Sequence, residues 1–574
     1  MLDVLISDGV VVDGTGAPAR RADVGIVGDR IVQIGAIDVD AVRTIDASDK
    51  VVTPGFVDVH THFDAQVFWD GALTPSPLHG VTTAFAGNCG FTIAPLLGDA
   101  NDADYLMRML ARVEGMPLQS LRQGVPWNWA STAEYLDAID GTLGINAGFM
   151  VGHSAIRRSV MRGDANRRAA RPDEIDAMCD LLRAGLEAGG VGFSSSYART
   201  HNDADGHMVP SRYATAEELV ALSRVTGEFE GTSIEFIPMN GTRFEPWAVD
   251  LIATMSAAAQ RALNWNIMHV NATSLDDNYQ KLAASDVARE RGGRVVALTI
   301  PMVVPTIISF RSGFLLDAMP GWSDAMLLPP DEKLRVLQDR DARARLRDGA
   351  ADPANPMHLH AHWDQHVILD VVAPENEQYR GLRVGEIASD DGRDPFDVLC
   401  DIAVADELNT SFGYAQRRED DADWAARLEI WRDGRAVIGA SDAGAHVDLL
   451  ASFNYPTMLL GEAVRDRGLL PIEEAVHLIT DVPARLYGLR DRGRLAEGAF
   501  ADVVVLDAAT VASDALRTRF DLPGDAGRLF AGAHGIEHVL VNGRAIVRDG
   551  ELTGERSGTL VRSGLHTETP ALDD

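Results

Sequence analysis

The two ends of the chain share an alternation of apolar and polar residues that is typical of short β-strands. The segments with this pattern are residues 2–12, 23–34, 43–52, 502–506 and 538–541. Turn clusters rich in Gly and Asp separate the early ones, and Asn542-Gly543 after the last is a hairpin signal. We therefore expect both termini to build one small β-sandwich domain, composed of residues 1–55 together with 488–574.

Between these ends, apolar runs of strand length alternate with amphipathic stretches of helical period. This order predicts βα units and a parallel sheet that is buried on both faces. A helix is expected over residues 172–188, where Pro172 suits the first turn. Strands are expected at residues 56–60, 82–86, 147–152, 191–195, 233–237, 266–270, 294–299 and 436–440. Eight such units predict an α/β fold in which residues 56–487 form a closed (β/α)8 TIM barrel.

One interval of the predicted barrel, residues 301–435, is too long for a single crossover and must hold extra elements, including a helix near residues 424–432. We expect it to act as a lid or a substrate-shaping insertion. Four histidines fall inside it, namely His358, His360, His362 and His366. Nothing in the sequence connects them to the end of the barrel, so packing within the insertion is the preferred interpretation.

Charge and composition narrow the functional class. The chain has 85 acidic and 52 basic side chains, a formal net charge of -33, which repels phosphate backbones and argues against nucleic-acid binding. The longest apolar stretch, residues 295–308, is broken by Pro301 and Pro305 and is shorter than the roughly 20 residues of a membrane span. Three scattered cysteines and the lack of a signal-like start favour a reducing cytoplasm.

Two histidines follow the first predicted barrel strand directly. His60 and His62 come after the apolar run 56–59, and alternate residues of an extended chain point to the same side. Barrel active sites lie at the carboxyl ends of the strands, and imidazole is a preferred ligand for zinc and similar ions. We therefore interpret the pair as metal ligands, in preference to two surface histidines.

The run PGFVDVHTH at 54–62 resembles the first strand of the amidohydrolase superfamily, and the resemblance covers nearly the whole chain. It extends to Ser441-Asp442 and to the closing segment GRLAEGAFADVVVLD at 493–507. Within the superfamily, Gly87-Asn88-Cys89-Gly90 and Gly192-Phe193-Ser194-Ser195 are similar to motifs of the N-acyl-D-amino-acid deacylase group. The resemblance implies a metal-dependent hydrolase of C–N bonds.

The resemblance also implies further metal ligands, Cys89 and His269. Many relatives bridge two metals with a carbamylated lysine, but the only lysines here are Lys50, Lys281 and Lys333, none on a predicted barrel strand. Cys89 is a reasonable substitute, because a metal-bound thiol is deprotonated. On the fifth strand, where relatives have a histidine, this chain offers only Glu235, which is either a ligand or one half of an ion pair.

Asp442 follows the strand predicted at 436–440 and is expected at the same barrel mouth. Such a carboxylate can bind metal, hold the attacking water, accept its proton and return it to the departing nitrogen, although aspartate is also a common helix N-cap. Four residues after the third and fourth strands are candidates for substrate binding, with ordinary loop polarity as the alternative: His153, Tyr197, Arg199 and His201. Arg199 suits a substrate carboxylate.

The sequence thus predicts a hydrolase that holds one or two divalent ions, preferably zinc, and removes the acyl group from an N-acyl-D-amino acid or a related small amide. A cyclic-amide or ureide hydrolase on the same scaffold is the first alternative. A metal-free, non-catalytic assembly protein is the second. The expected partner is a small-molecule amide, and association into a homo-oligomer is compatible with such a fold.

Overall fold

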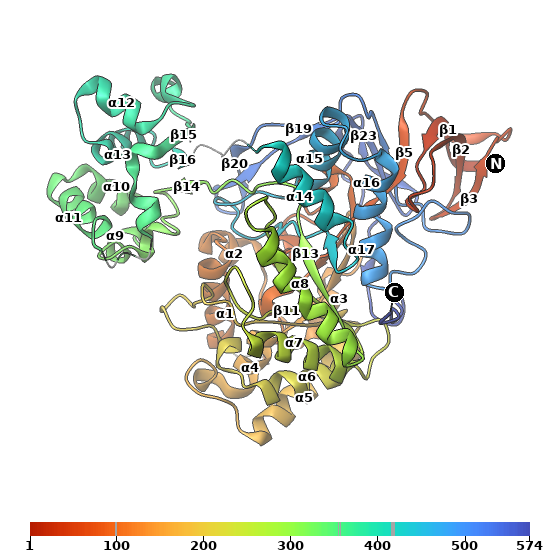
Figure 1. Ribbon diagram of the computed structural model, residues 1–574, viewed down its shortest axis with the longest axis horizontal. Coiled ribbons are helices and arrows are strands. Elements are labelled where there is room, and N and C mark those ends of the chain that lie inside the picture. The colour runs from red at the N-terminus through yellow and green to blue at the C-terminus, as the bar shows by residue number, and fades with distance from the viewer. Residues whose placement is uncertain (98–99, 354, 356, 415–418, 574) are drawn as a thin grey trace.

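The computed structural model describes residues 1–97, 100–353, 355, 357–414 and 419–573 (Figure 1). A six-stranded, all-parallel sheet with the order β17-β13-β12-β11-β10-β9 lies at its centre. Its strands are β9 (Val151–Gly152), β10 (Gly192–Ser196), β11 (Ser233–Ile237), β12 (Ala262–Met268), β13 (Arg294–Thr299) and β17 (Ala436–Ile438). Each overlaps a predicted strand, and β12 begins four residues before the predicted start.

A second parallel sheet of four strands, in the order β26-β8-β7-β6, flanks the first. Its strands are β6 (Phe56–Asp58), β7 (Val81–Ala86), β8 (Asn146–Phe149) and β26 (Leu560–Val561). Only Met150 separates β8 from β9, so the strand predicted at 147–152 is divided between the two sheets. On the other side, the Val59 amide donates to the Gly439 carbonyl at 2.8 Å, which ties the segment after β6 to the segment after β17.

Helices cover the outer face of the six-stranded sheet (Figure 1). They are α4 (His153–Met161), α5 (Pro172–Glu187), α6 (Ala216–Thr226), α7 (Pro246–Ala259) and α8 (Leu275–Glu290). The predicted helix at 172–188 is confirmed as α5, with Pro172 in its first turn. Met178 and Leu182 on its inner face are fully buried against the sheet core that contains Ile234 and Leu263, as the 3.6-residue period requires.

Strands from the two ends of the chain meet in a separate nine-stranded sheet, on the right of Figure 1. Its strands are β1 (Leu2–Val11), β2 (Arg20–Val27), β3 (Arg30–Gly35), β4 (Ala41–Asp46), β5 (Val51–Pro54), β18 (Val503–Leu506), β23 (Ile536–Val541), β24 (Arg544–Arg548) and β25 (Glu551–Leu552). β5 pairs with β18 and runs directly into β6, so the sheet joins the body where the first candidate ligands follow. The expectation that strands from both ends of the chain pair with each other is confirmed, although β26, within 488–574, lies in the four-stranded sheet.

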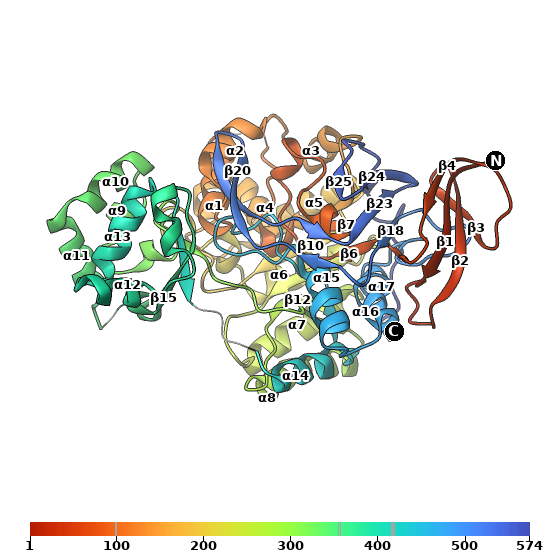
Figure 2. The ribbon, with the colours of Figure 1, turned by 90° about the horizontal axis from the view of Figure 1, so that it is seen from above.

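Most of the 301–435 interval stands apart from the body, on the left of Figures 1 and 2. It holds β14 (Ile308–Ser309), α9 (Ser323–Met326), α10 (Pro330–Gln338), α11 (Arg340–Ala350), β15 (His366–Asp370), α12 (Val384–Asp391), α13 (Pro395–Ala405) and β16 (Ser411–Tyr414). These elements have their own core, which includes Phe310, Trp322 and Phe412. The last element, α14 (Asp421–Trp431), packs on the body instead, since Trp424 and Ile430 belong to its cores.

Of the four histidines in the insertion, His366 is fully buried, with its ring 5.2 Å from that of Phe412 and 4.6 Å from that of Tyr414. Its Nε2 lies 3.0 Å from the His360 carbonyl. Its role is therefore packing within the insertion. Among the described residues, no helix is both long and apolar enough to cross a membrane.

Candidate metal centre and active site

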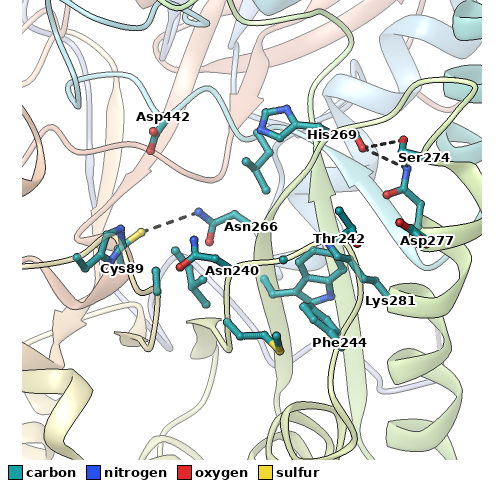
Figure 3. A pocket seen from close by; sticks show the side chains of 18 of the residues that line it. Cys89, Asn240, Thr242, Phe244, Asn266, His269, Ser274, Asp277, Lys281 and Asp442 are labelled. Atoms are coloured by element: carbon teal, nitrogen blue, oxygen red, sulfur yellow. Dashed lines mark hydrogen bonds between the residues drawn. The ribbon is translucent and has the colours of Figure 1, made fainter. Parts of the chain in front are cut away.

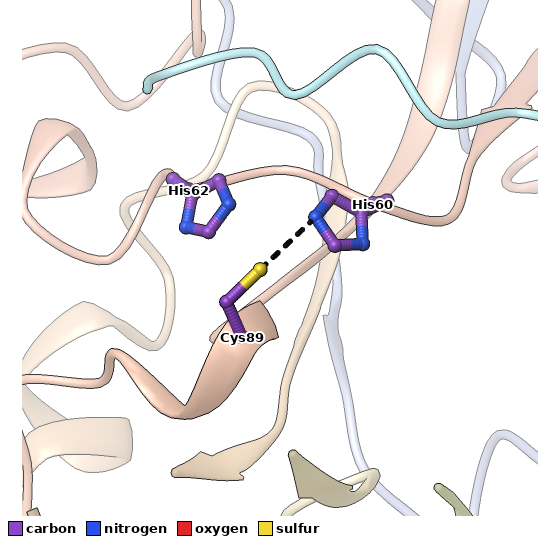
Figure 4. A group of neighbouring side chains, drawn as sticks. All are labelled: His60, His62 and Cys89. Atoms are coloured by element: carbon purple, nitrogen blue, oxygen red, sulfur yellow. Dashed lines mark hydrogen bonds between the residues drawn. The ribbon is translucent and has the colours of Figure 1, made fainter. Parts of the chain in front are cut away.

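His60 and His62 lie just beyond β6, with side chains only 1% and 2% exposed and ring centroids 5.3 Å apart. Figure 4 shows the thiol of Cys89 between them, with its Sγ 3.6 Å from His60 Nε2. One donor atom from each of the three residues lies within 4.8 Å of the other two. Three soft, buried donors that converge on one point are the arrangement expected of a transition-metal site.

The backbone around Cys89 is fixed by residues from three other elements. The Cys89 amide donates to Glu235 of β11 at 2.6 Å, and the Gly90 amide donates to the Ser194 hydroxyl of β10 at 3.0 Å. On the other side, the Gly87 amide donates to the Asp64 carboxylate at 2.9 Å. Cys89 itself has a left-handed backbone, with φ 56°. These contacts hold a strained turn so that its thiol faces the histidines.

Asp442, which follows β17, adds a carboxylate to the group formed by His60, His62 and Cys89. Its carboxylate lies 3.0 Å from His62 Nε2 and 3.5 Å from His60 Nε2, and its amide donates to the His60 carbonyl at 2.9 Å. Its side chain is 32% exposed, whereas both imidazoles are sealed from solvent. Asp442 is therefore the member of the group that both contacts the histidines and faces the cavity.

The electrostatics of the group favour a bound cation. Burial alone would raise the pKa of Asp442, but contacts with His60 and His62 outweigh it and hold that pKa well below the usual value. Burial would lower the pKa of His62, yet Glu114 and Asp442 raise it to about 10. Burial and the negative charge of Glu235 raise the pKa of the Cys89 thiol well above its usual value. A bound divalent cation would displace the thiol proton and offset the surrounding carboxylate charge, so the donor set fits such an ion.

Two polar groups near the centre, the half-buried Asn266 and the buried Glu114, were not predicted from the sequence. The Nδ2 of Asn266, on β12, lies 3.1 Å from His60 Nε2 and 3.9 Å from Cys89 Sγ. Glu114 follows the helix α1 (Ala100–Val113), and its Oε1 lies 3.5 Å from His62 Nδ1. Neither carries a sequence signal, because an asparagine on a strand and a glutamate after an amphipathic helix are ordinary residues there.

The predicted ligands His269 and Glu235 lie outside the group of three donors. His269 comes directly after β12 and lines the cavity, between Asp442 and Ser274 in the view of Figure 3. Glu235 is fully buried and accepts the Cys89 amide, and its pKa is raised to about 8, chiefly by burial. Neither belongs to the group of three donors within 4.8 Å.

The centre opens into a cavity of about 430 Å³, a size that suits a small-molecule ligand. The described residues that line it include His62, Cys89, Glu114, His201, Asn266, His269, Lys281, Asp442 and His446. His201 is the one predicted substrate-binding residue in this lining. Its Nδ1 lies 2.8 Å from the Ser196 hydroxyl, and burial lowers its pKa to about 3, so the ring is neutral at pH 7.

The other three predicted substrate-binding residues lie outside the described lining of this cavity. His153 is fully buried, with Nδ1 2.8 Å from the Ser195 hydroxyl and Nε2 2.8 Å from Glu218. The Tyr197 hydroxyl donates to the Ala214 carbonyl at 2.7 Å. Arg199 is exposed, and its amide donates to the Asn240 side chain.

His446 is a cavity residue that the sequence could have revealed. It follows Asp442 by four positions on the same loop, directly after a predicted barrel strand. Its amide donates to the Glu114 carbonyl, and its ring lies 5.5 Å from that of Phe314. The loop after β17 is thereby attached to the end of α1 and to the insertion.

A second group of potential ligands, Asp203, Asp205 and His207, lies elsewhere. Asp203 already accepts the amides of Asp205 and His207 through one oxygen. Its other oxygen accepts the Tyr105 hydroxyl at 3.1 Å and the Asn166 amide group at 2.7 Å. Both carboxylate oxygens of Asp203 are therefore already used to hold the turn, and we interpret the group as structural.

Comparisons with known proteins agree with this site. The Amidohydrolase family profile matches residues 43–547. The N-acyl-D-glutamate deacylase of Alcaligenes xylosoxydans xylosoxydans is 31% identical over 555 residues, 95% of this chain and 93% of that protein. A solved D-aminoacylase, described with a binuclear metal centre, superposes with a TM-score of 0.65 at 26% identity and covers 98% of this chain and 100% of its own.

A further solved structure, the N-acyl-D-glutamate deacylase of Bordetella bronchiseptica complexed with zinc and a phosphonate inhibitor, has a TM-score of 0.64 at 28% identity. The match covers 98% of this chain and 100% of that one. With the profile matching most of its length and relatives aligned end to end, this chain belongs to the Amidohydrolase family and is related to the N-acyl-D-amino-acid deacylases.

Proposed function

We propose that this protein hydrolyses the amide bond of an N-acyl-D-amino acid or a related small amide, with Asp442 as general base and then general acid. The observation that carries the proposal is the position of the Asp442 carboxylate, 3.0 Å from His62 Nε2 and open to the cavity. The relatives named as N-acyl-D-glutamate deacylase and D-aminoacylase support the substrate class.

The strands of the two parallel sheets that lie within residues 56–487 are, in this proposal, parts of one closed (β/α)8 barrel. Two junctions support closure: β8 continues into β9 after one residue, and Val59 donates to the Gly439 carbonyl. The terminal domain then comprises 1–55 with 488–574, apart from β26, which pairs with β8, and the 301–435 insertion contacts the cavity residue His446 through Phe314. Free thiols at Cys89, Cys179 and Cys400 support a cytoplasmic location.

His60, His62, Cys89 and Asp442 would hold the metal, for which zinc is our choice because one relative was solved with zinc. When bound, the ion supplies Lewis acidity that activates water and polarises the carbonyl. Glu114 orients the His62 imidazole from behind through Nδ1, and Glu235 fixes the Cys89 amide. Asn266 contacts the same Nε2 of His60 that faces Cys89 and Asp442, so it would adjoin the bound ion. We keep His269 and Glu235 as candidate ligands for a second ion.

The chain's own groups account for the proton transfers. Asp442 is ionised at neutral pH, so its exposed carboxylate oxygen can accept a proton from the attacking water and deliver it to the leaving nitrogen. The neutral His201 faces the same cavity and can hydrogen-bond to the substrate. His62 and Glu114 keep their positions through a buried contact, which preserves the orientation of Asp442.

The test is an Asp442→Asn variant assayed on N-acetyl-D-amino acids, with metal content measured on the same samples. We expect kcat to fall by roughly 10²–10⁴-fold, the usual contribution of a general acid-base group. Asparagine tolerates the left-handed backbone at this position, with φ 57°, so the fold should persist. Asp49→Asn is the matched control, because Asp49 is an exposed aspartate with φ 62° in the terminal sheet domain.

Full turnover by a folded, metal-loaded Asp442→Asn protein would rule out this role. The same assay on cyclic amides and ureides tests the alternative chemistry. If only cyclic substrates are opened, the scaffold is retained but the proposed substrate class is wrong.

A further inference from the structure

One basic side chain lies on the wall of the cavity opposite the metal centre. Lys281 lies on α8 and lines the cavity, and it is the only lysine or arginine among the described lining residues. Figure 3 shows Lys281 beyond His269, on the far side of the cavity from Cys89 and Asp442. The carboxylates Asp442 and Glu114 lie at the metal end, whereas the carboxylate at the Lys281 end, Asp277, is paired with Arg243.

Among the described residues, no carboxylate forms a salt bridge with Lys281. Asp277, one helical turn earlier, is already paired with Arg243, with 2.5 Å between Oδ1 and Nε. The Lys281 ammonium instead lies 5.7 Å and 5.8 Å from the ring centroids of Phe244 and Trp265. Burial lowers the pKa of Lys281, so the charged form is incompletely solvated and would gain from an anionic partner.

The surroundings of Lys281 are rigid enough to place a ligand. The Asn278 side chain donates to the His269 carbonyl at 3.1 Å, which fastens the loop after β12 to α8. The Ser274 hydroxyl accepts the Asn271 amide at 3.0 Å and reinforces the same turn. Lys281 and His269 are thereby held on one wall, with the polar side chains of Asn240 and Thr242 beside them.

We propose that Lys281 binds a carboxylate of the substrate and so directs the amide toward Asp442. This inference rests on the proposed function and adds a specificity residue to it. With the amide directed toward Asp442, an anionic group at the other end of the substrate is attracted to the Lys281 ammonium, which fixes the orientation of the substrate. The carboxylate is either the α-carboxylate of the amino acid or one on its side chain, and both have the same chemistry toward an ammonium group.

The experiment compares three substrates: N-acetyl-D-leucine, N-acetyl-D-leucinamide, and the α-amide of N-acetyl-D-glutamate. They carry an α-carboxylate, no carboxylate, and a side-chain carboxylate, respectively. Each is assayed with the wild type, Lys281→Met, Lys281→Arg and Arg289→Met. The last is the matched control, because Arg289 is on the same helix but is 70% exposed and paired with Asp286.

We expect Lys281→Met to raise KM for a carboxylate substrate by about ten- to a hundred-fold, the value of a charge-assisted hydrogen bond, with a smaller change in kcat. Lys281→Arg should retain most of the preference for the acid over the leucinamide. The substrate that loses affinity identifies which carboxylate is bound. An unchanged acid-to-amide ratio in folded Lys281→Met would overturn the inference.

The two proposals fail in different ways. If the metal-loaded wild type hydrolyses none of the three substrates, the proposed function is wrong and the inference falls with it. If the wild type is active but Lys281→Met and Arg289→Met behave alike, only the inference is wrong. Should Lys281→Met fold poorly, Lys281→Gln replaces it with the same expected result.

Discussion

At the residue scale, two residues of the proposed metal centre have a strained backbone. Cys89 and Asp442 both have φ near +57°, a region that few residues other than glycine occupy. Such a conformation costs on the order of 1 kcal/mol, and it persists because hydrogen bonds from other elements hold it. For Cys89 the partners are Glu235 and the turn around Gly90, and for Asp442 the partner is the His60 carbonyl.

Ser194 is expected to support the metal centre without touching it. Its hydroxyl accepts the Gly90 amide and also donates to the Gly87 carbonyl, so one side chain closes the turn that presents Cys89. Ser194→Ala should weaken zinc binding by roughly 10- to 100-fold, as loss of an orienting contact behind a ligand does. Zinc affinity by competition with a chromogenic chelator measures this directly.

Ser389→Ala is the control for that experiment, because Ser389 is an exposed serine on α12 of the insertion. Equal zinc affinity in the two variants would show that the turn keeps its shape without Ser194. The Cys89 thiol would then be positioned by Glu235 and Asp64 alone.

The sequence could predict the candidate ligands that have a chemical signature. His60, His62, Cys89 and Asp442 were expected together because histidine, cysteine and aspartate after predicted strands are unusual, and the structure brings all four side chains together. Asn266 beside them was not predicted, since an amide on a strand carries no such signature.

At the scale of elements, β12 shows that a strand can be found while its ends stay approximate. It runs over Ala262–Met268, so it begins four residues and ends two residues before the predicted 266–270. His269 therefore follows the strand and lines the cavity, while Asn266 within the strand lies beside His60. The hydrophobic pattern locates a strand but fixes its ends only to within a few residues.

The insertion is expected to unfold independently of the metal centre. Trp322 is fully buried in the insertion core, and its Nε1 donates to the Leu346 carbonyl at 2.7 Å. Trp322→Ala should destabilise this core by about 3–5 kcal/mol, the range for large aromatic truncations. Hydrogen exchange should accelerate in β14, β15 and β16 and remain slow in β10 through β13, with zinc content unchanged.

Trp322→Phe provides the graded control, because it keeps the ring but loses the hydrogen bond. A uniform acceleration of exchange across the central sheet after Trp322→Ala would mean that the insertion and the body form one cooperative unit. The insertion would then be part of the scaffold, and a role as a lid would lose its basis.

At the scale of the whole molecule, a buried cluster of polar side chains connects the terminal sheet to the parallel strands. Asp502, just before β18, accepts the Asn146 side chain at 3.0 Å and the Asn542 amide at 2.9 Å, and it pairs with the buried guanidinium of Arg492. Asn542 donates in turn to the Asn146 side-chain oxygen at 3.0 Å. Because Asn146 opens β8, residues far apart in sequence link the two parts of the fold.

This polar cluster predicts that the terminal sheet and the parallel strands lose stability together. Asp502→Ala leaves Arg492 buried without its carboxylate, which should lower the free energy of unfolding by about 3–5 kcal/mol. Asp502→Asn keeps an acceptor for Asn146 and should cost less. Urea unfolding followed by hydrogen exchange in both β18 and β8 provides the measurement. Faster exchange in β18 with β8 unaffected would mean that the terminal sheet is an appendage, whereas parallel changes would mean that it stabilises β8 and, through β7, the strand β6 that precedes His60.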